Sequence, residues 1–300
     1  MSYLAAKTGE SYEDAILLSL HGRKDENIIE KIRYNKKIFL LTSGINDVQK
    51  IAQDVCAAGI KEVTFTMGYR LSYEDESIKT YSAEELSGVS EDGLITCLIQ
   101  NKKPGRRSVC RGIKDDRFIR GDVPMTKEEV RTVSISKLGL FEGAVVYDIG
   151  AGTGSVSVQI ASASESITVY AIEKKAEALE LIERNRLSFG LGNIRVIEAE
   201  APCGLKDLPA ATHAFIGGSS GKLPAILRTL REINPSMRVC INAVSLETLG
   251  LINEIMCGFD IKNEEIISLQ PCRAKKVGEH HLMRAENPVF IFAFEFSDKG

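Results

Sequence analysis

Short apolar runs alternate with segments of helical spacing along most of the 300 residues of this chain. The runs have the length of buried strands, and the helical segments repeat apolar residues every three or four positions. Strand-like runs lie at residues 36–43, 62–66, 93–100, 145–147, 167–173, 193–199, 213–218, 238–244, 260–270 and 288–296; helical segments lie at residues 48–58, 126–139 and 176–189. This alternation predicts an α/β fold.

The composition changes at residues 101–121, where basic side chains cluster and the periodicity is lost. We therefore predict a basic linker there, between a smaller α/β half-domain at residues 1–100 and a larger domain at residues 122–300. The linker either lies in solvent or packs its second half over a pocket of the larger domain. Residues 1–100 show no catalytic constellation.

A glycine-dense turn follows the run at residues 145–147 and the acid Asp148. The turn consists of Gly150, Ala151, Gly152, Thr153 and Gly154, and a helical segment opens directly behind it. Alternate glycines let the backbone turn sharply and keep side chains away from a ligand, and the N-terminus of a helix offers free N–H groups. Serines 155 and 157 stand where a dinucleotide fingerprint has its third glycine, so the spacing is D-x-G-x-G-x-G.

This spacing resembles motif I of the Rossmann-like S-adenosylmethionine methyltransferases, and the alternative is a structural turn with no ligand. The resemblance implies S-adenosyl-L-methionine as the cofactor. It also implies a mostly parallel seven-stranded sheet of order 3-2-1-4-5-7-6, with an antiparallel final pair at residues 260–270 and 288–296. Glu173 ends the strand-like run after the turn, 23 positions beyond Gly150. That offset is close to the ~20 residues at which an acid reaches ribose hydroxyls.

Two longer stretches resemble a more specific family. The sequences RGIKDDRFIRGDVPMTKEEVR and FIGGSSGKL are similar to the precorrin-6B (cobalt-precorrin-6B) C15-methyltransferase (decarboxylating) family, and the similarity extends over about residues 112–300. The stretches SYLAAKTGESYEDAILLSLHGR, FLLTSGIND and EVTFTMGYRLSYEDESI resemble the C-terminal half of the tetrapyrrole methylase family, in particular precorrin-7 C5-methyltransferases. The other half is absent from residues 1–100, which are therefore a remnant, a docking module or one half of a divided enzyme.

The first family resemblance implies further site residues. Thr126 is expected beside the cofactor, and it also fits the N-cap of a helix with Glu129 completing a capping box. Glu200 and Ala201 are expected to line the adenine, although Glu200 by itself also fits an exposed loop acid. The expected substrate loop consists of Gly217, Gly218, Ser219, Ser220 and Gly221. Its open backbone suits a bulky flat substrate and offers N–H donors to carboxylates.

A basic segment at residues 272–287 is interpreted as a loop between the last two strands. Arg273 and Lys275 in this loop, together with Arg120, are candidates to bind substrate carboxylates, and the alternative is a solvated loop. The neighbouring His280 and His281 do not predict a metal site, since adjacent residues rarely ligate one ion and no acid or cysteine stands at useful spacing.

The family resemblance implies methylation of an anionic corrinoid precursor at C15 with decarboxylation of the ring-C acetate, in cobalamin biosynthesis. The substrate itself supplies the attacking carbon, so no protein nucleophile is expected, and catalysis is expected to rest on positioning and desolvation. The resemblance also implies a homo-oligomer, a tetramer by analogy. Whether the substrate carries cobalt stays open. The alternatives are an RNA or protein methyltransferase on the same fold, and a non-catalytic cofactor-binding scaffold.

Composition narrows these alternatives. A formal net charge of −3 argues against a nucleic-acid partner, which favours a basic excess. The chain has no apolar run long enough for a membrane span and no signal-peptide pattern at its start. The seven cysteines are scattered without a C-x-x-C pair, a usage typical of reduced thiols. We therefore predict a cytoplasmic enzyme with no membrane partner.

Overall fold

A computed structural model describes residues 1–21, 27–90, 93–105 and 112–297 of the chain. Contacts divide the chain into two compact units, one consisting of Met1–Val109 with Arg186–Gly192 and the other of Cys110–Asn185 with Asn193–Gly300. Residues 106–111 of the predicted linker lie outside the described residues. The domain limits expected from the sequence stay a prediction.

The first unit is built around a five-stranded mixed sheet of order β1-β2-β5-β3-β4. Strands β1 and β2 are parallel, and the remaining neighbours are antiparallel. The elements in chain order are α1 (Ser2–Thr8), β1 (Ile16–Ser19), α2 (Ile28–Tyr34), β2 (Lys37–Thr42), α3 (Ile45–Ala57), β3 (Val63–Tyr69), β4 (Ser77–Ser82), η1 (Glu85–Gly88) and β5 (Ile95–Asn101). The three expected strands and the expected helix of this region appear as β2, β3, β5 and α3.

The second unit contains a seven-stranded sheet of order β11-β14-β10-β9-β6-β7-β8. Five neighbouring strands, from β10 to β8, pair in parallel, and β14 runs antiparallel between β10 and β11. The strands are β6 (Val145–Ile149), β7 (Thr168–Glu173), β8 (Ile194–Glu198), β9 (His213–Ile216), β10 (Arg238–Ala243), β11 (Ile261–Leu269) and β14 (Val289–Phe296). Read from β8, the order is 3-2-1-4-5-7-6, so the predicted sheet is confirmed.

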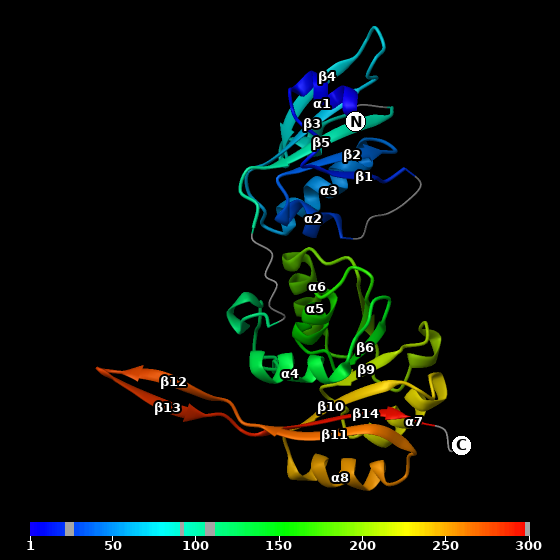
Figure 1. Cartoon of the computed structure of the whole chain (residues 1–300), viewed down its shortest axis with the longest axis vertical. Helices are drawn as coiled ribbons and strands as arrows, with labels where there is room; N and C mark the ends of the chain where they lie inside the picture. Colours follow the sequence, from blue (N-terminus) through cyan, green and yellow to red (C-terminus); the bar gives the residue numbers. More distant parts are fainter. Residues whose placement is uncertain (22–26, 91–92, 106–111, 298–300) are drawn as a thin grey trace. The chain divides into compact units, whose positions relative to one another are not determined.

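Helices follow the strands of this sheet in the manner of an α/β fold (Figure 1). They are α4 (Glu128–Leu138), α5 (Ser155–Ala161), α6 (Ala176–Phe189), α7 (Leu223–Ile233) and α8 (Leu246–Met256), with short turns η2 (Asp115–Arg117) and η3 (Leu205–Asp207). A buried cluster of aliphatic and aromatic side chains joins the sheet to α7 and α8, and Leu227, Leu230 and Ile252 in it have no exposed surface. Burial of this kind dominates the stability of such a unit.

The register of the parallel strands places their carboxyl ends side by side. Ile149, the last residue of β6, pairs with Ile172 of β7 and with Ile216 of β9. Glu173 at the end of β7 pairs with Glu198 of β8. The loops that leave these strands therefore start from one edge of the sheet, which is where open α/β sheets bind ligands.

Two local predictions for this unit are wrong. Helix α4 begins at Glu128 after Lys127, and no side chain caps it, so Thr126 and Glu129 do not form a capping box. The basic segment is an antiparallel hairpin and not a loop, with strands β12 (Cys272–Val277) and β13 (His280–Ala285). Figure 1 shows this hairpin extending away from the seven-stranded sheet. Among the described residues, no helix has the length and apolar character needed to cross a membrane.

Candidate active site

A pocket of about 450 Å³ opens at the carboxyl ends of β6, β7, β8 and β9 in the second unit. Most of the residues that the sequence assigned to a cofactor or substrate border it. They are Thr126, Gly150, Ala151, Gly152, Thr153, Glu173, Glu200, Ala201, Gly217, Gly218, Ser219 and Ser220. The apolar side chains of Ile149, Ile172 and Phe215 supply part of the wall. Such a mixture of apolar wall and convergent polar groups is typical of small-molecule sites.

The glycine turn and the loop after β9 approach each other closely. Gly150 has φ of +71°, and a Cβ at this position would lie 2.6 Å from the carbonyl oxygen of Gly218. The nitrogens of Gly150 and Ala151 donate to the carbonyl oxygen of Ile172 at 3.0 and 3.1 Å. Only glycine fits this combination of left-handed backbone and close contact. Gly154 does not border the pocket. It is the N-cap of helix α5 and has φ of +74°.

Glu173 is bound to the glycine turn. One carboxylate oxygen accepts from the Gly152 nitrogen at 3.0 Å, and the other accepts from the nitrogens of Lys174 and Lys175. A Cβ on Gly152 would lie 3.2 Å from the carbonyl oxygen of Pro124. The acid thus fixes the turn at the end of β7 while its carboxylate borders the pocket.

Asp148 is fully buried beneath the turn and also borders the pocket. Burial raises the pKa of its carboxyl to about 6, against hydrogen bonds from Ser157 that lower it. Ser157 Oγ donates to one oxygen, and the other oxygen, like Thr153 Oγ1, is buried without a hydrogen-bond partner among the described residues. The sequence showed Asp148 as the acid that ends the strand, yet it predicted no role for it.

Glu200 lies between two lysines at the rim of the pocket. Lys174 Nζ is 2.6 Å from one of its carboxylate oxygens and Lys222 Nζ is 2.7 Å from the other. These two hydrogen-bonded ammonium groups lower the pKa of the Glu200 carboxyl to about 2. The sequence did not predict either ion pair, because the two lysines lie 26 and 22 positions from Glu200 along the chain.

Residues 113–126, which we call the strap, form another wall. The strap ends with Val123, Pro124, Met125 and Thr126, all of which border the pocket. The buried side chain of Asn185 in α6 binds the strap through both backbone groups of Ile119, each at 2.8 Å, and also donates to the carbonyl oxygen of Thr153. The strap and the glycine turn therefore share one anchor.

None of the three basic candidates borders the pocket. Arg120 is exposed on the strap and Lys275 is exposed on β12, and neither borders the pocket. The guanidinium of Arg273 forms ion pairs with Glu129, Asp115 and Glu286. Gly221, at the far end of the substrate loop, also does not border the pocket. Asn242, Glu286 and Asn287 do border it, and the sequence analysis missed all three.

The described residues contain no group of three or more His, Cys, Asp or Glu side chains that would hold a metal ion. What the pocket does offer is a glycine turn, an acid at the end of the second strand, an acid-Ala turn after the third and an open loop after the fourth. On this sheet, such an arrangement defines a Rossmann-like methyltransferase.

Comparisons with known proteins lead to the family. Residues 117–295 match the family described as the precorrin methyltransferase domain, and the chain belongs to this family. It is 37% identical over 188 residues to cobalt-precorrin-6B C(15)-methyltransferase (decarboxylating) of Salmonella typhi, covering 60% of this chain and 94% of that one. It is 39% identical over 185 residues to a probable enzyme of the same name from Pyrobaculum calidifontis, covering 60% and 93%.

Solved structures are also similar to this chain. Precorrin-6y C5,15-methyltransferase from Geobacter metallireducens has a TM-score of 0.58 at 34% identity, over 61% of this chain and 96% of that one. Precorrin 8w decarboxylase from Methanobacterium thermoautotrophicum has a TM-score of 0.56 at 32% identity, over 62% and 100%. A SAM-dependent O-methyltransferase from Thermotoga maritima, at 15% identity and a TM-score of 0.53, shares the fold.

Proposed function

We propose that the chain is an S-adenosyl-L-methionine-dependent enzyme of cobalamin biosynthesis. It methylates a precorrin-6B-type macrocycle at C15 and decarboxylates the ring-C acetate, whose carboxylate leaves as carbon dioxide while a methyl group stays on the ring. One observation carries the proposal: a single pocket is bordered by the glycine turn, Glu173, the Glu200–Ala201 turn and the loop after β9. The names of the relatives at 37% and 39% identity support the reaction.

The residues of the pocket fit this cofactor. Gly150 and Gly152 leave room where a Cβ would meet backbone, and Thr153 Oγ1 is a buried hydroxyl with no partner among the described residues. Glu173 would accept hydrogen bonds from the ribose hydroxyls, since a carboxylate accepts at both oxygens. Ala201 and the backbone beside Glu200 would line the adenine, and Thr126 with the glycine turn would hold the amino-acid part.

When bound, the cofactor supplies a methyl group already activated by its sulfonium charge. The protein then has to orient the two reactants and to exclude water, and both effects lower the barrier without a protein nucleophile. Ile149, Ile172 and Phe215 give the pocket its apolar wall. The strap adds the apolar side chains of Val123 and Met125 to the lining of the pocket.

The anionic macrocycle would meet the open loop after β9. Gly217, Gly218, Ser219 and Ser220 border the pocket and carry backbone N–H groups that suit carboxylates. Lys174, which borders the pocket, and Lys222 both pair with Glu200, so the negative charge of this acid is compensated beside the loop. Arg120 and Lys275 are exposed and stay candidates for more distant carboxylates.

We also propose self-association and a cytoplasmic location. The hairpin exposes Val277, Leu282 and Met283 at 49%, 57% and 66% of their surfaces, and an isolated two-stranded hairpin is only marginally stable in water. A homo-oligomer, a tetramer by family analogy, would cover these side chains. The cysteines of the described residues are free thiols, which supports a reducing compartment. For residues 1–100 we keep the proposal of a tetrapyrrole methylase-like half-domain.

The test is turnover of purified chain with S-adenosylmethionine and either precorrin-6B or its cobalt form. Mass spectrometry of the product should show the gain of one methyl group and the loss of carbon dioxide. The substrate form that reacts decides between the metal-free and the cobalt route. Binding of the cofactor without any change of either substrate would contradict the proposed reaction.

A further inference from the structure

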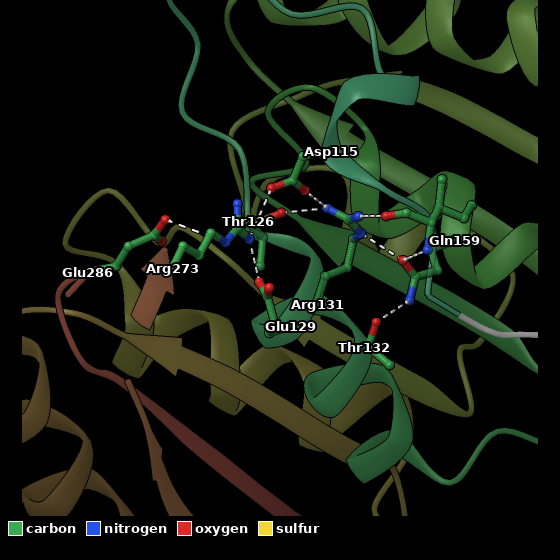
Figure 2. Close-up of polar contacts among 9 residues, drawn as sticks. Asp115, Thr126, Glu129, Arg131, Thr132, Gln159, Arg273 and Glu286 are labelled. Carbon is green, nitrogen blue, oxygen red and sulfur yellow. Dashed lines mark hydrogen bonds and ion pairs between the residues drawn. The ribbon is translucent and has the colours of Figure 1, made fainter. Parts of the chain in front are cut away.

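Arg131 of α4 has no exposed surface, and Figure 2 shows its guanidinium at the centre of a polar cluster. Its Nε donates to Gln159 Oε1 at 2.7 Å, and its Nη1 donates to the carbonyl oxygen of Thr126 at 2.6 Å and to Asp115 Oδ1 at 3.2 Å. Its Nη2 donates to the carbonyl oxygen of Ile113. A buried charge is costly unless it is paired and hydrogen-bonded, and this guanidinium is both.

Most of these partners belong to the strap. The ring of Phe118, a further strap residue, lies 4.7 Å from the guanidinium carbon. Gln159 Oε1 also accepts from the backbone nitrogen of Ile113 at 3.2 Å. One arginine therefore binds the strap at its beginning, middle and end. Thr126, the last residue so held, borders the pocket together with Val123, Pro124 and Met125.

A second arginine reaches the same cluster from the hairpin. Arg273 of β12 pairs with Glu129 of α4, and its Nη2 lies 3.5 Å from Asp115 Oδ2. This oxygen is buried and makes no hydrogen bond with the described residues, so its contact with Arg273 is the ion pair alone. The Nε of Arg273 also lies 3.9 Å from Glu286, which borders the pocket (Figure 2).

We propose that Arg131 is the positioning residue of the strap wall, and that Arg273, acting through Asp115, makes the position of this wall depend on the β12–β13 hairpin. The inference rests on the proposed function, because a bound S-adenosyl compound reports the state of the wall.

The direction of the effect follows from the charges. Without Arg273, the carboxylate of Asp115 keeps its ion pair with Arg131 through Oδ1, but its buried Oδ2 loses the charged partner that the described residues give it. A buried acceptor left in this way destabilises the segment that carries it. The strap then unfolds locally more often, while the sheet beneath it stays folded. Affinity for a ligand of the closed pocket falls in proportion to the closed fraction.

The chain offers a matched pair of hairpin variants. Arg273→Gln removes the ion pair with Asp115 together with those to Glu129 and Glu286. Arg284→Gln removes the same charge from the residue paired with Arg273 in the register of the hairpin. Arg284 is exposed and forms no ion pair with the described residues. Hydrogen exchange of amides in residues 113–126 is measured on the ligand-free full chain, and calorimetry with S-adenosylhomocysteine is measured in parallel.

We expect Arg273→Gln to speed hydrogen exchange in the strap and to weaken the binding of S-adenosylhomocysteine about five- to tenfold, the lower end of the range for an allosteric coupling. Arg284→Gln should change neither. Arg131→Lys keeps the charge but lacks the planar fork, and it should weaken binding more than Arg273→Gln does. Equal behaviour of the two hairpin variants, or unchanged exchange and affinity in Arg273→Gln, would overturn the inference. Failure of the unmodified chain to bind would instead overturn the proposed function, and the exchange data would still test the strap.

Discussion

Single residues of the pocket are fixed by contacts between loops that are distant in the sequence. Gly150 of the turn touches Gly218 of the loop after β9, and Gly152 binds the carboxylate of Glu173. Each contact joins the ends of two different strands. The geometry of the pocket therefore depends on backbone positions at which a single added carbon matters.

Replacing Gly150 by alanine tests this dependence. The left-handed backbone alone costs about 1–2 kcal/mol for a residue with a Cβ, and the new Cβ would also lie 2.6 Å from the Gly218 oxygen. We expect at least tenfold weaker binding of S-adenosylhomocysteine by calorimetry. Gly139→Ala is the control, because Gly139 has φ of +62° but open space around the Cβ position. Equal losses of affinity in both variants would show that the contact with the loop is unimportant.

Asp148 makes the stability of the fold depend on pH. Its pKa is raised from 3.8 to about 6 by burial, so the folded chain binds more protons than the unfolded chain between these values. The contribution of Asp148 to the free energy of unfolding is complete below about pH 4 and is lost as the pH rises through 6. It amounts to at most about 3 kcal/mol. Asp148→Asn removes this dependence. Urea unfolding at pH 4.5 and pH 7 should therefore show the variant gaining stability relative to the unmodified chain at the higher pH. If the unfolding free energies of the variant and the unmodified chain differ by the same amount at both pH values, the raised pKa of Asp148 is contradicted.

At the scale of elements, the strands were the most predictable part of the chain. Their apolar runs have the length of buried strands and are bounded by polar turns, and the resemblance to methyltransferases gave the order of the sheet. The β12–β13 hairpin was missed because nearly all of its side chains are exposed, so no buried apolar face marks it in the sequence. Its two-residue turn at Gly278 and Glu279 was the available signal.

The elements around the pocket show a second limit of prediction from the sequence. The cap at Thr126 was wrong because the structure gives α4 no side-chain cap; there the Thr126 carbonyl oxygen accepts from Arg131. The ion pairs of Glu200 and the contacts of Asp115 join distant segments. Motif spacing therefore indicated the residues that border the pocket, whereas the residues that hold its walls needed the fold.

The hairpin carries a prediction at this scale. Its exposed Leu282 and Met283 are expected to lie in a contact between copies of the chain, since large exposed apolar side chains mark such surfaces. The double variant Leu282→Glu and Met283→Glu should dissociate the oligomer in light scattering, because charges there would be desolvated. A control variant at the exposed Leu94 of the first unit should leave the mass unchanged. An unmodified chain that is already monomeric would contradict the prediction.

At the scale of the whole molecule, the family match lies on residues 117–295, and the reported relatives span about 60% of the chain. The proposed cofactor site lies within the same part, since all of its bordering residues belong to the second unit. We therefore expect one cofactor per chain, bound by the second unit alone.

Calorimetric titration of S-adenosylmethionine and S-adenosylhomocysteine into the full chain tests this claim most directly. It is repeated with Glu173→Ala and with Glu198→Ala, which removes the acid paired with Glu173 in the sheet but absent from the pocket. We predict one site per chain, weakened at least tenfold by Glu173→Ala and unchanged by Glu198→Ala. Two sites would contradict the assignment of the cofactor to the second unit alone. The absence of binding would contradict the assignment of the chain as a methyltransferase.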